Sequence, residues 1–316
     1  MGREDKRSLV VVEAFLSAFI PAVLFILLCR KLCITPFGDR TFLYDDVKRQ
    51  YIDFYAYFKA VLHGRDGFLY SEHSGLGANM LGTWAYYLTS PFVLMFAFAP
   101  ENLFPTALTF FTLLKISAIG FFMWIFLVGI ARRFGFTLEN TWEHRAVNLV
   151  CSTAFAYSGW IIANMTNSMW LDVVMLLPLF CLCVIKTILK ERHGFLFLVL
   201  TTTMMIVANY YIAAMIFMFM ILFGIVFVAL KIVKVNDGLK VAAALFLGFV
   251  LDLWHIIPVF ESLFGSNKDH FGFVAKVLTS FLPSSENVGR ILLPWVIVSK
   301  LFSMSYSTNE IMTGLP

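Results

Sequence analysis

The sequence predicts an all-α protein that crosses a membrane several times, as a helical bundle, and three observations support this prediction. Hydrophobic residues make up 60% of the 316 residues and charged residues only 14%, which leaves too few polar side chains to cover a soluble globule. The mean hydropathy is +0.82. The apolar residues also occur in runs close to the roughly 20 residues that a helix needs to span a bilayer.

The first apolar run, from Leu9 to Cys29, predicts an uncleaved membrane span. It follows Arg3, Lys6 and Arg7, but it is longer than the apolar region of a signal peptide and no small-residue cleavage site follows it. Six further runs predict spans, which makes seven in all; they cover residues 104–130, 146–163, 170–189, 194–209, 211–230 and 241–260.

Basic residues occur in every second connection between these spans. The intervening connections, NMTNSMW and the NYY turn, contain no Lys or Arg. Because Lys and Arg in short loops mark the cytoplasmic side, we expect a cytoplasmic amino terminus and three cytoplasmic connections. The basic residues of those connections are Arg132, Arg133, Arg145, Lys186, Lys190, Arg192, Lys231, Lys234 and Lys240.

Residues 80–99 are apolar enough to span, but counting them as a span would place the three basic connections outside. Pro91 interrupts the run, and Trp84, Tyr86 and Tyr87 suit the headgroup zone. We therefore expect an interfacial or re-entrant helix, with the inverted topology as the alternative. The first external region then covers residues 30–102.

Bases are frequent in this external loop, which is either merely translocated or forms a rim for a phosphate-bearing ligand at the membrane surface. The net charge of +4 gives no argument for a nucleic-acid partner. The five cysteines indicate neither a disulfide framework nor a zinc site, although a pairing of Cys29 with Cys33 stays open.

Within the loop, residues 42–62 read FLYDDVKRQYIDFYAYFKAVL and predict an amphipathic helix on the membrane surface. The paired acids Asp45 and Asp46 have two interpretations. One of them caps the helix, or one is a general base that deprotonates an acceptor hydroxyl. The expected polar face holds Asp46, Gln50, Asp53 and Tyr57, and the expected apolar face holds Tyr51, Phe54, Tyr55 and Phe58.

Several polar residues lie in or beside the predicted spans. Asp172 has either a functional role or a capping role at the start of its span, and Lys115 is expected to pair with a buried acid or to line a cavity. Asp252 and His255 share a helix face, as a polar lining or half of a metal site. The turn at Asn209 and Tyr210 lies on the predicted active side.

Five motifs in order give the chain a likeness to a known family: FGDRTFLYDDVKRQYIDFYAYF, SGLGANMLGTWAYYLTSPF, LLKISAIGFFMW, YSGWIIANMTNSMWLDVVMLLPL and NYYIAAM. Together they resemble the bacterial YfhO family of membrane proteins. The resemblance implies a GT-C-fold glycosyltransferase that uses a polyprenyl-phosphate-linked sugar on the outer side of the cytoplasmic membrane, for instance to decorate teichoic acids or another cell-envelope glycopolymer.

The resemblance also implies site residues. The essential acid of the first external loop maps to Asp46, with Asp45 as the second choice. Some relatives of this fold require a divalent cation and others do not, so a metal ion is an open expectation and no cofactor is assigned. The expected substrate-binding residues are Arg40, Lys48, Arg49, Gln50, Tyr51, Gly75, Gly77, Trp170, Asp172, Asn209 and Tyr210, with the two glycines offering backbone amides to a phosphate.

In the family the end of this chain continues into further spans. We therefore expect residues 1–316 to be the amino-terminal part of a longer protein, with 262–316 as an external segment, and the fragment alone to lack part of its substrate site. Two other function classes stay open: a transporter or flippase of a lipid-linked sugar, and a noncatalytic membrane scaffold. A transporter is expected to show inverted repeats and broken helices, and the sequence shows no such repeat.

Overall fold

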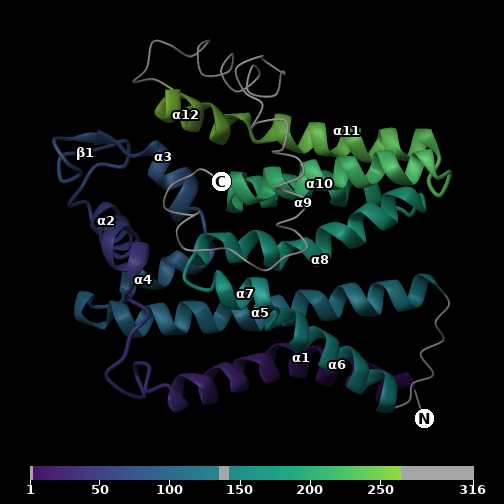
Figure 1. The fold of residues 1–316 in the computed structure, drawn as a ribbon, viewed down its shortest axis with the longest axis horizontal. Coiled ribbons are helices and arrows are strands. Elements are labelled where there is room, and N and C mark those ends of the chain that lie inside the picture. The colour runs from purple at the N-terminus through teal and green to yellow at the C-terminus, as the bar shows by residue number, and fades with distance from the viewer. Residues whose placement is uncertain (1–2, 135–141, 265–316) are drawn as a thin grey trace, which may run out of the picture. The chain divides into compact units, whose positions relative to one another are not determined.

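The structure, a computed structural model, describes residues 3–134 and 142–264 and is built almost entirely of helices (Figure 1). The prediction of an all-α, multi-pass membrane protein is confirmed. From residue 265 on, the expected external segment 262–316 lies outside the described residues. The long helices are α1 (Arg3–Lys31), α5 (Phe104–Arg133), α6 (Trp142–Ala156), α8 (Ser168–Ile188), α9 (Gly194–Ala208), α10 (Tyr210–Ala229), α11 (Val235–Leu251) and α12 (Leu253–Phe264).

Short elements fill the long first loop and one later turn. The loop contains a single two-stranded antiparallel hairpin, in which Tyr70 pairs with Asn79. The short elements are η1 (Val47–Tyr51), α2 (Ile52–Leu62), β1 (Tyr70–Ser71), β2 (Ala78–Asn79), α3 (Leu81–Thr83), η2 (Trp84–Leu88), η3 (Pro91–Val93), α4 (Leu94–Phe98), η4 (Glu101–Leu103) and, before α8, α7 (Gly159–Ala163).

Five helical segments of the described part are long and apolar enough to cross a membrane, and two bent helix pairs raise the number to seven if each pair is one span. Two predicted spans differ from this picture. Helix α9 has only 15 residues, which at about 1.5 Å per residue is shorter than the roughly 30 Å of a bilayer core. The predicted span 241–260 is divided into α11 and α12, which meet at 66°.

Both differences have a local cause. Helix α9 lies between α8 and α11 and buries Leu198, Thr202 and Met205, so protein rather than lipid covers much of it. At the bend, the Asp252 carboxylate lies 3.1 Å from Nδ1 of His255. A side chain that bonds locally in this way competes with helix propagation.

The helices pack in the order α1 and α6 on α5, α5 on α8, α8 on α9, and α9 on α11. Glycines allow the closest approaches. A Cβ added at Gly120 of α5 would lie 2.5 Å from the Ser17 carbonyl oxygen of α1, and one at Gly248 of α11 would lie 2.6 Å from Cβ of Thr202.

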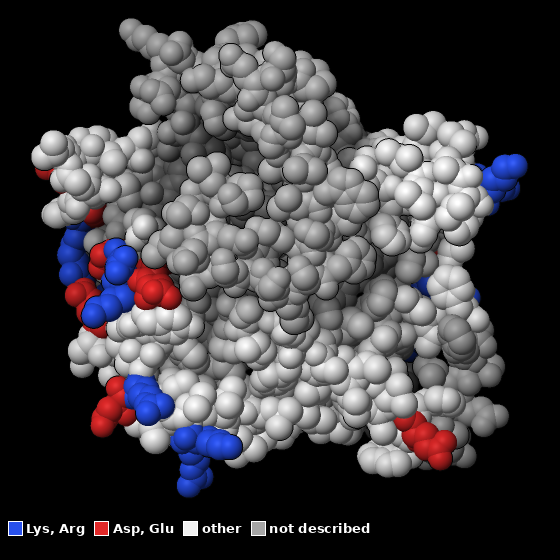
Figure 2. Space-filling view, in the orientation of Figure 1, with Lys and Arg blue, Asp and Glu red and all other residues white. Residues whose placement is uncertain are grey.

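The basic connections lie together at one end of the helices. The guanidinium of Arg133, the last residue of α5, donates to Glu191, before α9, with N to O distances of 2.6 Å. Lys190 lies 3.8 Å from Asp237 of α11. On the face seen in Figure 2, charged side chains lie over the two ends of the helices, and the described surface between them is uncharged. The expectation that these connections share one side is thus supported by direct contacts.

The long first loop folds at the opposite end. The expected helix is present, as a π-helical turn η1 followed by α2. Three residues of the expected apolar face, Tyr51, Tyr55 and Phe58, are buried, whereas the fourth, Phe54, is half-buried and lines a cavity with residues of the expected polar face. The expectation that the apolar face lies on the bilayer is wrong, because protein covers it. The ring of Tyr55 stacks on Phe96 with centroids 4.2 Å apart.

Residues 81–98 form two short helical pieces that are bent by 95°. The beginning and the end of this segment both bond to α2. The indole of Trp84 donates to the Tyr57 hydroxyl at 2.9 Å, and Lys59 donates to the Ala99 carbonyl at 2.7 Å. Because partners two residues apart hold both ends, the segment returns to the side from which it started. This placement favours the interfacial or re-entrant interpretation over the inverted topology.

A buried ion pair joins the two central helices. Lys115 of α5 and Asp172 of α8 lie 2.8 Å apart, with side chains 0% and 2% exposed. The ammonium also donates to the Ser168 carbonyl at 2.7 Å and lies 4.2 Å from the centroid of the Phe111 ring. The expectation that Lys115 pairs with a buried acid is confirmed.

Replacing Lys115 by Met leaves the Asp172 charge buried without a partner. We expect a loss of about 3 to 5 kcal/mol of unfolding free energy, because the cost of burying one charge is no longer offset. The double variant Lys115→Met with Asp172→Leu should recover most of this loss. Reversible unfolding in mixed micelles measures both. A double variant no more stable than the single one would contradict the pairing.

Replacing Gly120 by Leu inserts a side chain where α1 and α5 touch. We expect a destabilisation of about 1 to 3 kcal/mol, since the Ser17 carbonyl leaves no room for the new atoms. Gly224→Ala is the matched control in another membrane helix, because an added Cβ there meets nothing within 4 Å. Equal effects of the two substitutions in the same unfolding assay would refute the close approach.

Candidate functional site

Asp45 and Asp46 stand at the start of the helix formed by η1 and α2. Both side chains are exposed, and within the described part of the chain neither carboxylate forms a hydrogen bond or an ion pair. Asp46 occupies the position before η1, but its side chain accepts no bond from the helix backbone. The capping role considered for Asp46 is therefore absent, and its carboxylate is open to a ligand.

The two acids differ in backbone conformation. Asp45 has φ of 45°, in the left-handed region that residues other than Gly rarely adopt and that Asp tolerates better than most. Asp46 is helical, with φ of −64°. Asp45 therefore forms the turn into the helix, and Asp46 is the first acid that the helix itself positions.

Tyr51, on the buried face of the same helix, fixes the start of that helix to α8. Its hydroxyl donates to Oδ1 of Asn167, between α7 and α8, at 2.9 Å. Burial, and then the nearby Tyr87 and Asp46, raise the pKa of the Tyr51 phenol above its usual value. Tyr51 thus stays neutral and anchors the helix start, and Asp46 is close enough to act on it electrostatically.

The Tyr51 ring also belongs to an aromatic cluster, which consists of Tyr51, Tyr86, Tyr87, Trp170 and Tyr210. The ring centroids of Tyr51 and Tyr87 are 5.3 Å apart, those of Tyr86 and Tyr87 are 4.6 Å apart, and those of Tyr86 and Tyr210 are 5.6 Å apart. The Trp170 indole donates to the Tyr86 hydroxyl at 3.0 Å. The cluster therefore joins η1, η2, α8 and α10, and it brings the predicted residues Tyr51, Trp170 and Tyr210 together.

Two other predicted residues lie beneath the cluster and are closed to a ligand in this structure. Asn209 is fully buried; it caps α10 by accepting from the Ile212 amide at 3.1 Å and donates to the Tyr86 carbonyl at 3.3 Å. Asp172 is 2% exposed and pairs with Lys115. Both positions hold the surrounding elements in place rather than presenting a polar atom to the surface.

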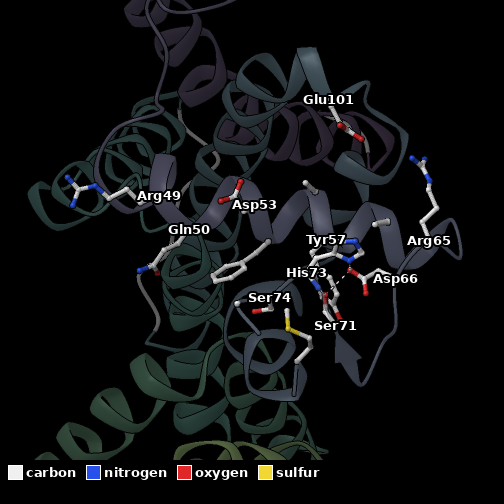
Figure 3. Close-up of a pocket in the computed structure, with 15 residues that line it drawn as sticks. Arg49, Gln50, Asp53, Tyr57, Arg65, Asp66, Ser71, His73, Ser74 and Glu101 are labelled. Atoms are coloured by element: carbon white, nitrogen blue, oxygen red, sulfur yellow. Dashed lines mark hydrogen bonds and ion pairs between the residues drawn. The ribbon is translucent and has the colours of Figure 1, made fainter. Parts of the chain in front are cut away.

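A polar cavity of about 590 Å³ lies between α2 and the hairpin loop (Figure 3). Its volume falls within the range of about 300 to 1,000 Å³ that is typical of small-molecule sites. Three of the predicted substrate-binding residues, Arg49, Gln50 and Gly75, line it, whereas Asp46 does not. The other polar side chains on its wall are Asp53, Tyr57, Arg65, Asp66, Ser71, His73, Ser74 and Glu101.

The floor of the cavity is organised by Asp66. Its carboxylate accepts from the Ser71 hydroxyl and from the Gly67 amide, both at 2.8 Å, and lies 3.2 Å from Nδ1 of His73. Partial burial alone would raise the pKa of Asp66, but these hydrogen bonds outweigh it and hold the pKa below its usual value. Asp66 is therefore ionised at neutral pH and holds the residues before and after β1 together, while the Tyr57 hydroxyl of α2 donates to the Gly67 carbonyl at 2.8 Å.

The two predicted glycines take left-handed conformations, with φ of 63° at Gly75 and 100° at Gly77. The Gly77 amide donates to the Ser74 carbonyl at 3.0 Å, and the Tyr70 hydroxyl occupies the space where a Cβ would lie. Gly77 is thus required by the turn, and its amide is not free for a phosphate. Gly75 has open space around it and borders the cavity.

The remaining predicted bases, Arg40 and Lys48, are exposed on the same loop. In the described residues neither forms an ion pair, so both are available to an anion, although no contact links Arg40 to Asp45 or Asp46. The described residues contain no group of three metal-binding side chains of the His, Cys, Asp or Glu type. Asp252 and His255 form the predicted pair on one face, but only with each other.

Tyr86, Tyr87 and Asp66 were missed as site residues. The tyrosines belong to a segment that the sequence assigned to the headgroup zone, and only the tertiary contacts with Trp170 and Tyr51 show their role. No sequence pattern indicated Asp66, because a functional Asp in a polar loop looks the same in the sequence as a solvated one.

A family model described as the bacterial membrane protein YfhO matches residues 17–298. No curated protein and no solved structure matches the chain. The family match covers every element described above except the beginning of α1, so the resemblance of the five motifs is confirmed. The chain belongs to the YfhO family of bacterial membrane proteins.

Proposed function

We propose that this protein transfers a sugar from a polyprenyl-phosphate donor to a cell-envelope glycopolymer, at the outer face of the bacterial cytoplasmic membrane. The observation that carries the proposal is the exposed Asp46 carboxylate, which has no structural partner among the described residues although the helix that presents it is firmly anchored. Such a carboxylate is suited to act as a general base.

The chemistry required of the protein is limited. The acceptor hydroxyl attacks the anomeric carbon of the sugar, the bond from that carbon to the lipid phosphate breaks, and the hydroxyl proton passes to the Asp46 carboxylate. The departing phosphate carries negative charge, which nearby cations stabilise. Lys48 and Arg49 follow Asp46 in η1 and are exposed, so they are the candidates for this task.

The cavity beside α2 is a candidate site for the sugar-bearing acceptor. Its wall contains three acids, two arginines and several hydroxyl groups, which suits the many hydrogen-bond donors and acceptors of a sugar. Arg49 and Gln50 lie at the boundary between this cavity and the start of η1, so a single acceptor chain placed there is directed toward Asp46. The aromatic cluster offers flat apolar faces on the other side.

The proposal also fixes an orientation. Two ion pairs, Arg133 with Glu191 and Lys190 with Asp237, join the three basic connections. The positive-inside rule predicts that these connections lie in the cytoplasm, and the proposal puts the loop that carries Asp46 outside. An envelope polymer and a lipid-linked donor are both accessible from that side.

The orientation predicts the reactivity of Cys33, which is exposed after α1. A membrane-impermeant maleimide applied to intact cells or protoplasts should label the chain, and Cys33→Ser should remove that label. In the Cys33→Ser background, a cysteine introduced at Lys234, in a basic connection, should react only after the membrane is made permeable. The reverse pattern of labelling would overturn the orientation.

The base assignment predicts the effect of replacing each acid. In membranes that contain the full-length gene product, Asp46→Asn should lower transfer from a radiolabelled polyprenyl-phosphate sugar by about 10² to 10⁴-fold, the usual contribution of a general base. Asp45→Asn should reduce it much less, since Asp45 forms the turn. Glu72→Gln, an exposed acid of the same loop outside the cavity, is the control and should retain full transfer.

Equal losses in Asp46→Asn and Glu72→Gln at matched expression would reject the base assignment. A wild-type protein that moves the lipid-linked sugar across the bilayer without transferring it would replace the proposal by the flippase alternative.

A further inference from the structure

We propose that the end of the protein opposite the Asp46 loop binds one anionic glycerophospholipid, with its phosphate at Lys190, Lys234 and Lys240 and an acyl chain in the groove between α8, α10 and α11. This site is separate from the proposed transfer site and does not depend on the proposed function.

The groove is a gap in the packing of α10. Along this 20-residue helix only Ile212 and Ala213, both in its first turn, are buried. Farther along, a cavity of about 650 Å³ separates α10 from α8 and α11. Its wall is almost entirely aliphatic and aromatic, with Ile185, Phe227 and Leu245 among the lining residues. At Gly224, which also lines the groove, an added Cβ meets nothing within 4 Å.

A second cavity, of about 580 Å³, adjoins the mouth of the groove and is polar. Lys190, Lys234 and Lys240 line it, and Leu239 belongs to the walls of both cavities. The two cavities thus come together at Leu239, and the proposal places the headgroup at the lysines and an acyl chain past this residue in the apolar groove. The polar cavity lies at the same end as the basic connections, which is where a span meets the headgroup layer.

The charge of the polar cavity favours an anion. Its one acid, Asp237, lies 3.8 Å from Lys190 and 3.7 Å from Lys240, and both lysine side chains are more than half exposed. Lys234 forms no ion pair in the described residues. Three ammonium groups thus face one carboxylate, and the excess positive charge remains accessible to a phosphate.

These two features together specify the class of ligand. A free phosphate or a nucleotide would use the lysines but leave the apolar groove empty, and a neutral lipid would fill the groove but leave the lysines without a partner. Basic pockets between membrane helices at the level of the headgroups are suited to anionic lipids. An anionic diacyl phospholipid, which is present in the surrounding leaflet, satisfies both.

Lipid retention tests the proposal. The full chain is purified in mild detergent with equal amounts of phosphatidylglycerol and phosphatidylcholine, and native mass spectrometry counts the lipids that stay bound. We expect one retained phosphatidylglycerol. The triple variant Lys190→Gln, Lys234→Gln and Lys240→Gln should lose the preference by at least about tenfold, as expected for three lysines near a headgroup. Gly224→Phe, which fills the groove, should lower retention of both lipids.

Two controls separate a site from general surface charge. Arg192→Gln removes an exposed base at the same end that lines neither cavity, and Gly159→Phe fills an open helical position elsewhere; both should retain lipid as the wild type does. If the triple variant does not fold, Lys234→Gln alone should weaken the preference in the same direction, and added salt should weaken it further.

A triple variant with unchanged preference, or an Arg192→Gln variant with an equal loss, would overturn the proposal. Displacement of phosphatidylglycerol by an equimolar polyprenyl phosphate would overturn the choice of ligand, and would assign the groove to an isoprenoid chain instead.

Discussion

The ion pair between Lys115 and Asp172 constrains the arrangement of the whole described part, because neither charge has access to solvent. A single buried charge in a membrane helix is costly, so α5 and α8 must stay in the register that keeps the two groups 2.8 Å apart. The same ammonium holds the Ser168 carbonyl, which fixes the first turn of α8. The Ser168 hydroxyl in turn lies 2.9 Å from the hydroxyl of Tyr55 in α2.

This series of contacts connects the central helices α5 and α8 to the long first loop. Tyr55 and Tyr51 occupy the buried face of one helix and bond to Ser168 and Asn167, which are adjacent at the start of α8. The opposite face presents Asp46, Gln50 and Asp53, whose side chains are exposed. One face of this helix thus fixes its position, and the other face exposes polar side chains to solvent.

Features that depend on residue pattern were predictable from the sequence, and features that depend on tertiary contact were not. Apolar runs located the long helices, and the spacing of Tyr51, Tyr55 and Phe58 identified the buried face of α2. The same spacing could not tell whether lipid or protein covers that face, because both are apolar. Lys115 was recognisable as a residue that needs a partner, but Asp172 emerged as that partner only from the packing of α5 on α8. The bend at Asp252 and the role of Tyr86 depend on side-chain hydrogen bonds, which the spacing of apolar residues in the sequence does not indicate.

The two ends of helix α10 are held by the rest of the protein to different degrees. At the end near the first loop Asn209 caps it and bonds to the Tyr86 carbonyl, so its first turn is fixed to the aromatic cluster. Toward the other end its side chains face the groove or the bilayer, and no buried polar contact holds it.

Close packing is the main source of helix association in membranes, where lipid replaces water as the competing solvent. A helix that the protein packs only at one end depends on lipid for the rest, and a bound phospholipid in the groove supplies the contacts that α8 and α11 do not reach. The lysines at the mouth then determine which lipid does so, because only an anionic headgroup compensates their charge.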